Sequence, residues 1–290
     1  MELSVIIVNY KVYHYLIPCI QSVQAALNGI EGEIIVIDNE SISEESKRIM
    51  ELFPSIRFIT NLDNKGFSKA NNQGLAIAKG NLVLFLNPDT LLPAHALKCS
   101  LDYLNNHDFV GALGVQMVNK KGQFLPESKR AFPTPLAAFF KLSGIAGLFP
   151  QSGFFNQYAL GNLNKDQTHQ VGILAGAYLM ARTHLVKSVG GFDEQFFMYG
   201  EDIDLSKKMT DAGFQNHYLG DIIIQHFKGA STNKNSNSYL YHFYHSMHLF
   251  VNKYYAGRTS WFKRLVLLFS INLAKTIADI KNQFYCFFNK

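Results

Sequence analysis

The chain has 290 residues, of which 48% are hydrophobic and 17% are charged. This length accommodates one α/β domain with an appendage, and the composition excludes a disordered or fibrous chain. The formal charge of +5 is unevenly distributed, because residues 228–290 carry nine Lys or Arg against one acid and are net +8, whereas the first 227 residues are net −3. A local basic segment indicates a partner that bears phosphate, either nucleic acid or anionic lipid.

The cysteines and the start of the chain bear on the compartment. Cys19, Cys99 and Cys286 are odd in number and widely spaced, which fits neither a disulfide framework nor a cysteine zinc site. The apolar run Val5–Val8 is too short for the core of a signal peptide. We therefore expect a protein of the reducing cytoplasm.

Apolar, β-branched segments predict buried strands over residues 3–10, 33–38, 56–60 and 82–86. Segments with helical spacing lie between them, so the alternation predicts an α/β fold with a doubly wound, mainly parallel sheet flanked by helices. Residues 126–170 have no clean period, and their structure is left open. Spacing predicts a helix over 201–212 that ends at Gly213.

Ligands of doubly wound sheets bind at the carboxyl ends of the strands, which directs attention to the polar residues there. Asn9, Asp38 and Asn61 each fall where a predicted strand stops. Asp38 is typical either of a turn or of a group that accepts hydrogen bonds from a nucleotide. Asn64 and Gly66 begin a stretch rich in Gly and Asn, where a backbone approaches a ligand closely or simply forms a loop.

Three further signals each have two interpretations. The turn Asn87–Asp89 follows a strand and offers hard oxygen ligands for Mg²⁺ or Mn²⁺, or it is an ordinary Asn-Pro turn. Residues 193–204 hold five acids among aromatic residues, which suits either a general base or a solvated helix start. His226 is either a core histidine or a metal ligand. The basic pair at 129–130 is more typical of the surface than of a phosphate contact.

Taken together, these motifs resemble family 2 glycosyltransferases of the GT-A fold, in particular the rhamnosyltransferase-like branch. The motifs span roughly residues 3–231 and read, in order, SVIIVNY, IVIDNES, NKGFSKANNQG, LFLNPD, GILAGAYLMAR, GGFDEQFFMYGEDIDLSKKM and His226 followed by KGAS.

The resemblance implies a GT-A catalytic domain over residues 1–230, with a nucleotide-binding half to about 115 and an acceptor half beyond it. It implies that Asp202 is the catalytic base and that Glu201 supports acceptor binding. It also implies that a divalent cation, Mn²⁺ or Mg²⁺, is held by Asp89 and His226. The implied donor-binding residues are Asn9, Asp38, Asn64, Gly66, Asn87, Asp89 and Gly176. Many relatives have Asp where this chain has Asn87, which removes one anionic ligand from the metal.

The implied reaction is an inverting transfer from dTDP-rhamnose or a UDP-sugar to a hydroxyl of a lipid-linked or surface-polysaccharide glycan. A non-catalytic module that binds nucleotide sugars is the alternative. A dinucleotide-dependent oxidoreductase is disfavoured because no Gly-x-Gly-x-x-Gly follows the first strand.

The tail, residues 231–290, is expected to be helical and basic. Its longest charge-free stretch, 265–274, is too short to span a bilayer. Aromatic ends and interspersed lysines suit a helix at an anionic membrane surface, and they favour lipid over nucleic acid. Packing against the catalytic domain is the other interpretation. We therefore expect a cytoplasmic protein that is peripheral at the inner face of the cell membrane.

Overall fold

The computed structural model describes residues 1–290 except 41–42, 228–236, 257–260 and 289–290. In the described part of the chain, the strands form one sheet in the order β3-β2-β1-β4-β8-β6-β9-β5, with β7 paired to β9. The strands are β1 Leu3–Asn9, β2 Gly32–Asp38, β3 Arg57–Thr60, β4 Leu82–Leu86, β5 Thr90–Leu91, β6 Val110–Val118, β7 His169–Val171, β8 Tyr178–Arg182 and β9 Gln215–His226.

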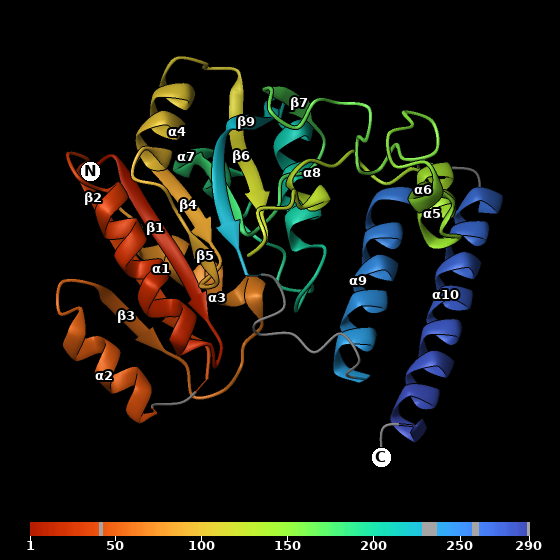
Figure 1. The fold of residues 1–290 in the computed structure, drawn as a ribbon, viewed down its shortest axis with the longest axis horizontal. Coiled ribbons are helices and arrows are strands. Elements are labelled where there is room, and N and C mark those ends of the chain that lie inside the picture. The colour runs from red at the N-terminus through yellow and green to blue at the C-terminus, as the bar shows by residue number, and fades with distance from the viewer. Residues whose placement is uncertain (41–42, 228–236, 257–260, 289–290) are drawn as a thin grey trace.

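Helices cover both faces of this sheet, so the predicted doubly wound fold is confirmed (Figure 1). One core lies between the strands and α1, α2 and α4, and the other lies between the strands and α3, α7 and α8. The helices are α1 Tyr13–Ala26, α2 Glu44–Leu52, α3 Phe67–Ile77, α4 Ala96–Asn105, α5 Pro135–Leu142, α6 Ile145–Leu148, α7 Thr183–Ser188, α8 Glu201–Asp211, α9 Asn237–Tyr255 and α10 Trp261–Phe288, with a 3₁₀ turn, η1, at Pro126–Ser128.

The first four long strands are parallel, as expected from their continuous apolar pattern. β1 pairs in parallel with β2 and β4, and β2 pairs in parallel with β3. Their register sets Asn9 beside Asp38 and Asp38 beside Thr60. Because parallel strands end at the same edge, the polar residues that follow them gather there.

The second half of the sheet is mixed. β8 runs antiparallel to both β4 and β6, while β6 and β9 are parallel with two irregularities in register. All nine residues of β6 are buried, yet the sequence did not predict this strand. The glycines of β6 explain why the strand was not predicted, because glycine weakens the sequence pattern of a strand. Close packing requires glycine at position 111, since a Cβ there would lie 2.7 Å from Leu185 and from Phe214.

The acidic motif leads into α8, and the predicted helix is confirmed to within one residue. Gly200 (φ +96°) precedes the helix, and Gly213 (φ +91°) follows it, both in the left-handed region that favours glycine. The glycines therefore fix where Glu201 and Asp202 stand, at the first turn of α8.

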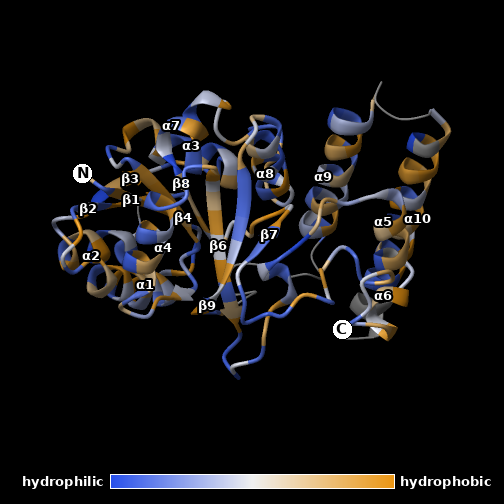
Figure 2. Cartoon of the chain, turned by 90° about the horizontal axis from the view of Figure 1, so that it is seen from above, coloured by the Kyte–Doolittle hydropathy of each residue, from blue (hydrophilic) through white to orange (hydrophobic). Residues whose placement is uncertain are grey.

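The two C-terminal helices lie side by side at one end of the molecule (Figures 1 and 2). α9 faces the α/β part, whereas α10 packs on α9 and on α5. No helix within the described ranges has the length and hydropathy needed to cross a membrane.

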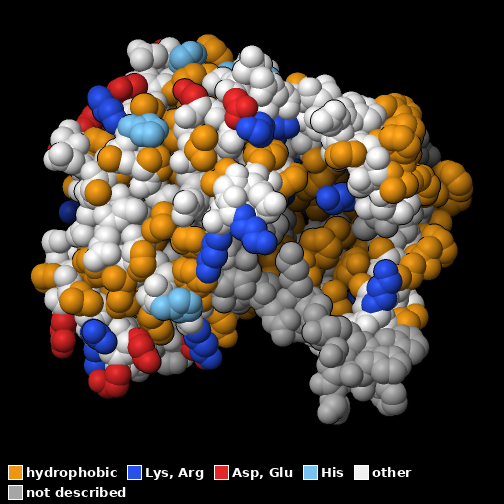
Figure 3. Space-filling view, viewed as in Figure 1, with side chains coloured by type: hydrophobic (Ala, Val, Ile, Leu, Met, Phe, Trp, Pro, Cys, Tyr) orange, Lys and Arg blue, Asp and Glu red, His pale blue; other side chains and the backbone are white. Residues whose placement is uncertain are grey.

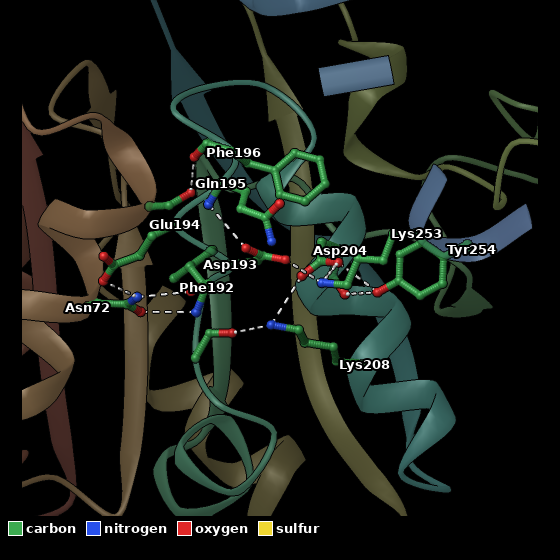
Figure 4. A network of polar contacts seen from close by, with 12 residues as sticks. Asn72, Phe192, Asp193, Glu194, Gln195, Phe196, Asp204, Lys208, Lys253 and Tyr254 are labelled. Atoms are coloured by element: carbon green, nitrogen blue, oxygen red, sulfur yellow. Dashed lines mark hydrogen bonds and ion pairs between the residues drawn. The ribbon is translucent and has the colours of Figure 1, made fainter. Parts of the chain in front are cut away.

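A buried polar network joins α9 to the sheet domain (Figure 4). Lys253 Nζ on α9 lies 2.7 Å from Asp204 Oδ1 and 2.5 Å from Asp193 Oδ2. The Asp204 side chain is fully buried, accepts a hydrogen bond of 2.7 Å from Tyr254 Oη and pairs with Lys208 Nζ at 3.1 Å. A buried carboxylate requires such partners, so this network fixes α9 in place.

We expect Lys253→Met to lower the free energy of unfolding by about 3 kcal/mol, because it removes one partner of a buried carboxylate. The matched control is Lys275→Met on α10, whose 2.9 Å pair with Asp279 is exposed and is expected to contribute less than about 1 kcal/mol. Urea unfolding of both variants checks this. Equal losses would contradict the importance of the buried network.

Candidate functional site

The first part of the candidate site lies at the ends of β1 and β2. Asn9 Nδ2 donates to Asp38 Oδ1 at 3.1 Å, and Tyr13 Oη donates to Asp38 Oδ2 at 3.0 Å. Burial raises the pKa of Asp38, and the bonds from Asn9 and Tyr13 partly oppose that rise. Asn9 Oδ1 is buried without a hydrogen-bond partner in the described part of the chain. This corner therefore presents acceptors to a ligand that carries N–H or O–H groups.

Hydrogen bonds of asparagine side chains fix the conformation of the loop between β3 and α3. Asn39 Nδ2 donates to Asn64 Oδ1 at 2.9 Å and to the Gly66 carbonyl at 3.2 Å, while Asn61 Nδ2 donates to Asn39 Oδ1 at 3.0 Å. Asn64 Oδ1 also accepts from the Gly66 amide at 2.9 Å. These bonds hold Asn64 and Gly66 at the edge of the sheet where Asp38 lies.

Gly66 is required by both its backbone angle and its surroundings. Its φ is +84°, and a Cβ there would lie 2.7 Å from the carbonyl oxygen of Phe197. The next amide, of Phe67, donates to that same oxygen at 2.7 Å. The loop that starts α3 is thereby joined to residues 193–200, which lead into Glu201 and Asp202.

Asp89 and His226 meet although they are far apart in the sequence. β5 pairs with the end of β9 so that Thr90 lies opposite His226. The Nε2 atom of His226 lies 3.3 Å from Asp89 Oδ1 and 3.5 Å from Asn87 Nδ2. Asp89 and His226 are only 6% and 7% exposed. The KGAS motif after His226 falls on residues 228–231, outside the described residues.

These side chains suit a divalent cation that shares its ligands with a substrate. The described ranges contain no group of three or more His, Cys, Asp or Glu side chains able to hold a metal ion. Asp89 and His226 supply one oxygen and one nitrogen ligand, and His226 Nδ1 is buried without a partner among described atoms. Mg²⁺ sites commonly combine one or two carboxylates with substrate phosphates and water, so a pair of protein ligands fits this pattern.

Asp202 is held on three sides at the start of α8. Its Oδ2 lies 2.5 Å from Arg130 Nη2 and 3.4 Å from the Gly176 amide, and its Oδ1 accepts from the Ile203 amide at 2.8 Å. Gly176 has no Cβ to intervene: one placed there would lie 3.6 Å from Asp202 Cβ and 3.6 Å from the Phe67 ring. Asp202 is thus next to the start of α3.

The basic pair at 129–130 is not on the surface, so that interpretation is wrong. Lys129 is 2% exposed and donates to the Leu160 carbonyl at 2.5 Å. Arg130 pairs with Asp202 and also donates to the Leu174 carbonyl at 3.2 Å. A single bridge to Ile173 sets Arg130 in this position, and no local sequence pattern announces such a bridge.

Glu201 differs from its neighbour in making no direct ion pair among the described residues. It is 7% exposed, and its Oε2 has no hydrogen-bond partner among the described residues. Burial, followed by the negative charge of Asp202, raises the pKa of Glu201 to about 8. At neutral pH, therefore, Glu201 is largely protonated and is able to donate a hydrogen bond.

Comparison with known proteins bears on this geometry. The family model for "Glycosyl transferase family 2" matches residues 4–172. The chain is 26% identical over 237 residues, 77% of its length and 76% of the relative's, to the N-acetylglucosaminyl-diphospho-decaprenol L-rhamnosyltransferase of Mycobacterium tuberculosis. It is 26% identical over 202 residues, 64% of its length and 69% of the relative's, to the rhamnosyltransferase WbbL of Escherichia coli.

Solved structures agree on the fold. S. aureus TarS 1–349 in complex with UDP-GlcNAc aligns with a TM-score of 0.58 at 18% identity, covering 92% of this chain and 70% of TarS. GalNAc-T7 with UDP, GalNAc and Mn²⁺ aligns with a TM-score of 0.56 at 15% identity, covering 78% of this chain and 43% of that one. These likenesses bear on the arrangement of the sheet and its helices.

The raised pKa of Glu201 predicts a pH-dependent stability. Between its ordinary value near 4.5 and about 8, the folded state holds a proton that the unfolded state has lost. Stability therefore falls as pH rises through this window, by at most about 1.4 kcal/mol per pH unit. We expect Glu201→Gln to remove this fall and to be more stable than the wild type at pH 9. Urea unfolding at pH 5–9 measures both slopes, and identical slopes would contradict the assignment.

Proposed function

Because the chain belongs to the family 2 glycosyltransferases, we propose that it transfers a sugar, with inversion, from dTDP-rhamnose or a UDP-sugar to an acceptor hydroxyl. Glycosyl transfer from a nucleotide sugar is its activity, and the acceptor is a lipid-linked or polysaccharide glycan. The rhamnosyltransferases of M. tuberculosis and E. coli among its relatives support the choice of sugar. The convergence of Asp89 and His226 at the same edge as Asp38 is the observation that carries the proposal.

Asp38 and Asn9 form the corner that receives the nucleobase of the donor. Thymine and uracil present the same ring N–H between two carbonyls, so the acceptors of this corner suit dTDP and UDP alike. Asn64 and Gly66 line the pocket beside the base, where the glycine brings the backbone close to the ligand. Asn87 and Gly176 complete the donor-binding set.

Asp89 and His226 are the residues that would hold a divalent cation, Mn²⁺ or Mg²⁺, with Asn87 beside them. When bound there, the ion supplies electrostatic stabilisation to the departing nucleoside diphosphate. The distance of 3.3 Å between His226 Nε2 and Asp89 Oδ1 supports this assignment.

Asp202 acts as the general base. Arg130 and the Ile203 amide fix its carboxylate, and it accepts the proton of the acceptor hydroxyl as that oxygen attacks the anomeric carbon. The bond between the anomeric carbon and the diphosphate breaks in the same displacement, which inverts the configuration. Glu201, being protonated, donates a hydrogen bond to the acceptor. Holding both substrates in line supplies much of the rate enhancement.

The tail gives the enzyme its place at the inner face of the cell membrane. α10 is basic and carries exposed apolar side chains, the properties of a helix that lies in the interface of an anionic membrane. The name of the M. tuberculosis relative includes a decaprenol-linked acceptor, and a lipid-linked acceptor for this chain agrees with such a location. Nucleic acid has no part in this proposal.

Asp202→Asn separates the enzyme from a module that only binds nucleotide sugars. We expect transfer to fall by about 10³-fold, because a general base contributes 10²–10⁴-fold, while the donor still raises the melting temperature. Asp211→Asn, at the exposed end of α8, is the control and retains activity. The measurement is sugar transfer alongside thermal stabilisation by dTDP-rhamnose and UDP-sugars. If the wild type transfers from none of these donors, the module is the better description.

Removal of divalent cations is expected to abolish transfer, and Mn²⁺ to restore it. We expect Asp89→Asn and His226→Gln to weaken the stabilisation that Mn²⁺ gives together with a nucleoside diphosphate, whereas the exposed His95→Gln does not. Turnover in chelator and thermal unfolding with Mn²⁺ plus UDP or dTDP provide the two readouts. Undiminished turnover in chelator would overturn the roles of Asp89 and His226.

A further inference from the structure

Residues 134–157 leave the sheet domain as an excursion that carries α5 and α6, and this excursion displays large apolar side chains. Leu136, Phe139, Leu148, Phe149 and Phe154 are between 44% and 76% exposed. Within the same segment, Phe155 contacts the Phe140 ring edge to face and stacks on the Phe149 ring. Soluble surfaces rarely gather so many exposed aromatic side chains in one short segment.

α10 adds a second set of exposed apolar side chains at helical spacing. The stripe consists of Phe262, Leu265, Phe269, Leu273, Ile277 and Ile280, each between 46% and 65% exposed. α10 packs on α5, where Ala138 contacts the cluster that joins α9 and α10, and Tyr255 Oη on α9 donates to the Pro133 carbonyl. Hydrophobic side chains accordingly gather along the outer edge of the molecule at this end (Figure 3).

The charged residues near this surface indicate what kind of partner binds it. The excursion, residues 134–157, has one charged residue, Lys141, and α10 has four Lys or Arg with Asp279 as its one acid. Asp279 pairs with Lys275 at 2.9 Å. The excursion and α10, which are distant in sequence and pack on each other, are thus both net positive. An apolar surface bordered by an excess of basic residues complements anionic lipid headgroups over acyl chains.

The excursion is tied directly to the site. The segment after the excursion is hydrogen-bonded to the segment before it. The Ala131 amide donates to the Tyr158 carbonyl at 2.9 Å, and Lys129 donates to the Leu160 carbonyl. Arg130 donates to Tyr158 Oη at 3.4 Å and pairs with Asp202 at 2.5 Å. Arg130, which lies just before the excursion, is therefore also the residue that orients Asp202, the proposed general base.

We propose that the α5–α6 excursion, together with the stripe of α10, inserts into the interface of an anionic bilayer. The bilayer surface then lies beside Asp202, where an acceptor anchored by its lipid and bearing a diphosphate is delivered. This second statement rests on the proposed function, whereas insertion of the excursion does not depend on it. The excursion, and not the tail alone, is the membrane-contacting element nearest the site.

Fluorescence tests insertion directly, because Trp261 at the start of α10 is the single tryptophan and is 75% exposed. Vesicles of phosphatidylglycerol and phosphatidylcholine are expected to shift its emission to the blue. Lipids brominated on their acyl chains are expected to quench it. In a Trp261→Phe background, Phe149→Trp moves the reporter to the excursion, and the same blue shift and quenching are expected. Absence of both at position 149, with binding retained, would overturn the role of the excursion.

Charge substitution supplies the second arm. We expect Leu148→Asp with Phe149→Asp to weaken sedimentation with anionic vesicles by about tenfold or more. Leu52→Asp on α2, which is 52% exposed, is the matched control and leaves sedimentation unchanged. Equal sedimentation of all three proteins would contradict the proposal. Concentration-dependent dimerisation without vesicles that the paired substitution abolishes would also contradict it, by assigning the surface to a second copy.

The two proposals fail in different ways. Donor-dependent thermal stabilisation of the Leu148→Asp, Phe149→Asp variant is expected to match that of the wild type, because neither residue lies in the donor site. Insertion without any sugar transfer would leave the surface assignment standing and remove the transferase proposal. Transfer to a water-soluble acceptor with no insertion at position 149 would leave the transferase proposal standing and remove the surface assignment.

Discussion

The contact between Gly66 and Phe197 is the constraint on which the site depends. The Phe67 amide donates to the Phe197 carbonyl at 2.7 Å, and only a glycine at 66 leaves room for that approach. The loop before α3 and the segment before α8 are thereby fixed to each other at one point. The Phe197 ring also stacks on His242 of α9 at 4.4 Å, so the C-terminal helices are held to the same point. The loop that starts α3, the segment that leads into Asp202 and helix α9 are consequently all in contact with Phe197.

Two adjacent carboxyl groups show how surroundings decide chemical roles. Asp202 faces Arg130 and two backbone amides, which hold its carboxylate in place. Glu201 is buried beside the negative charge of Asp202, and these two effects outweigh the charge of Arg130 and raise the pKa of Glu201 to about 8, so it holds a proton at neutral pH. One residue is then able to accept a proton while its neighbour donates a hydrogen bond. A difference in burial and partners, rather than in residue type, separates the two.

Local sequence pattern predicted the parallel strands and α8 well, because apolar runs and glycine stops are signals read within a few residues. β6 escaped prediction because its glycines serve close packing and weaken the strand pattern. Arg130 escaped because its position comes from a bridge to Ile173, 43 positions along the chain. His226 and Asp89 were paired only through the family resemblance, since no spacing rule links residues on β5 and β9. The roles of these residues stay predictions.

The two helices of the tail differ in how they are held to the sheet domain. α9 is held by a buried polar network, in which Lys253 pairs with Asp193 and Asp204, and a helix so held is part of the enzyme's frame. α10 makes no such polar anchorage to the sheet domain among the described residues and turns its apolar stripe outward. Asp204 lies on α8, which begins with Glu201 and Asp202, so the ion pairs of Lys253 connect α9 to the helix that carries Asp202. α10 is connected to Asp202 by two routes, one through α9 and one through α5 and the excursion that returns to Arg130.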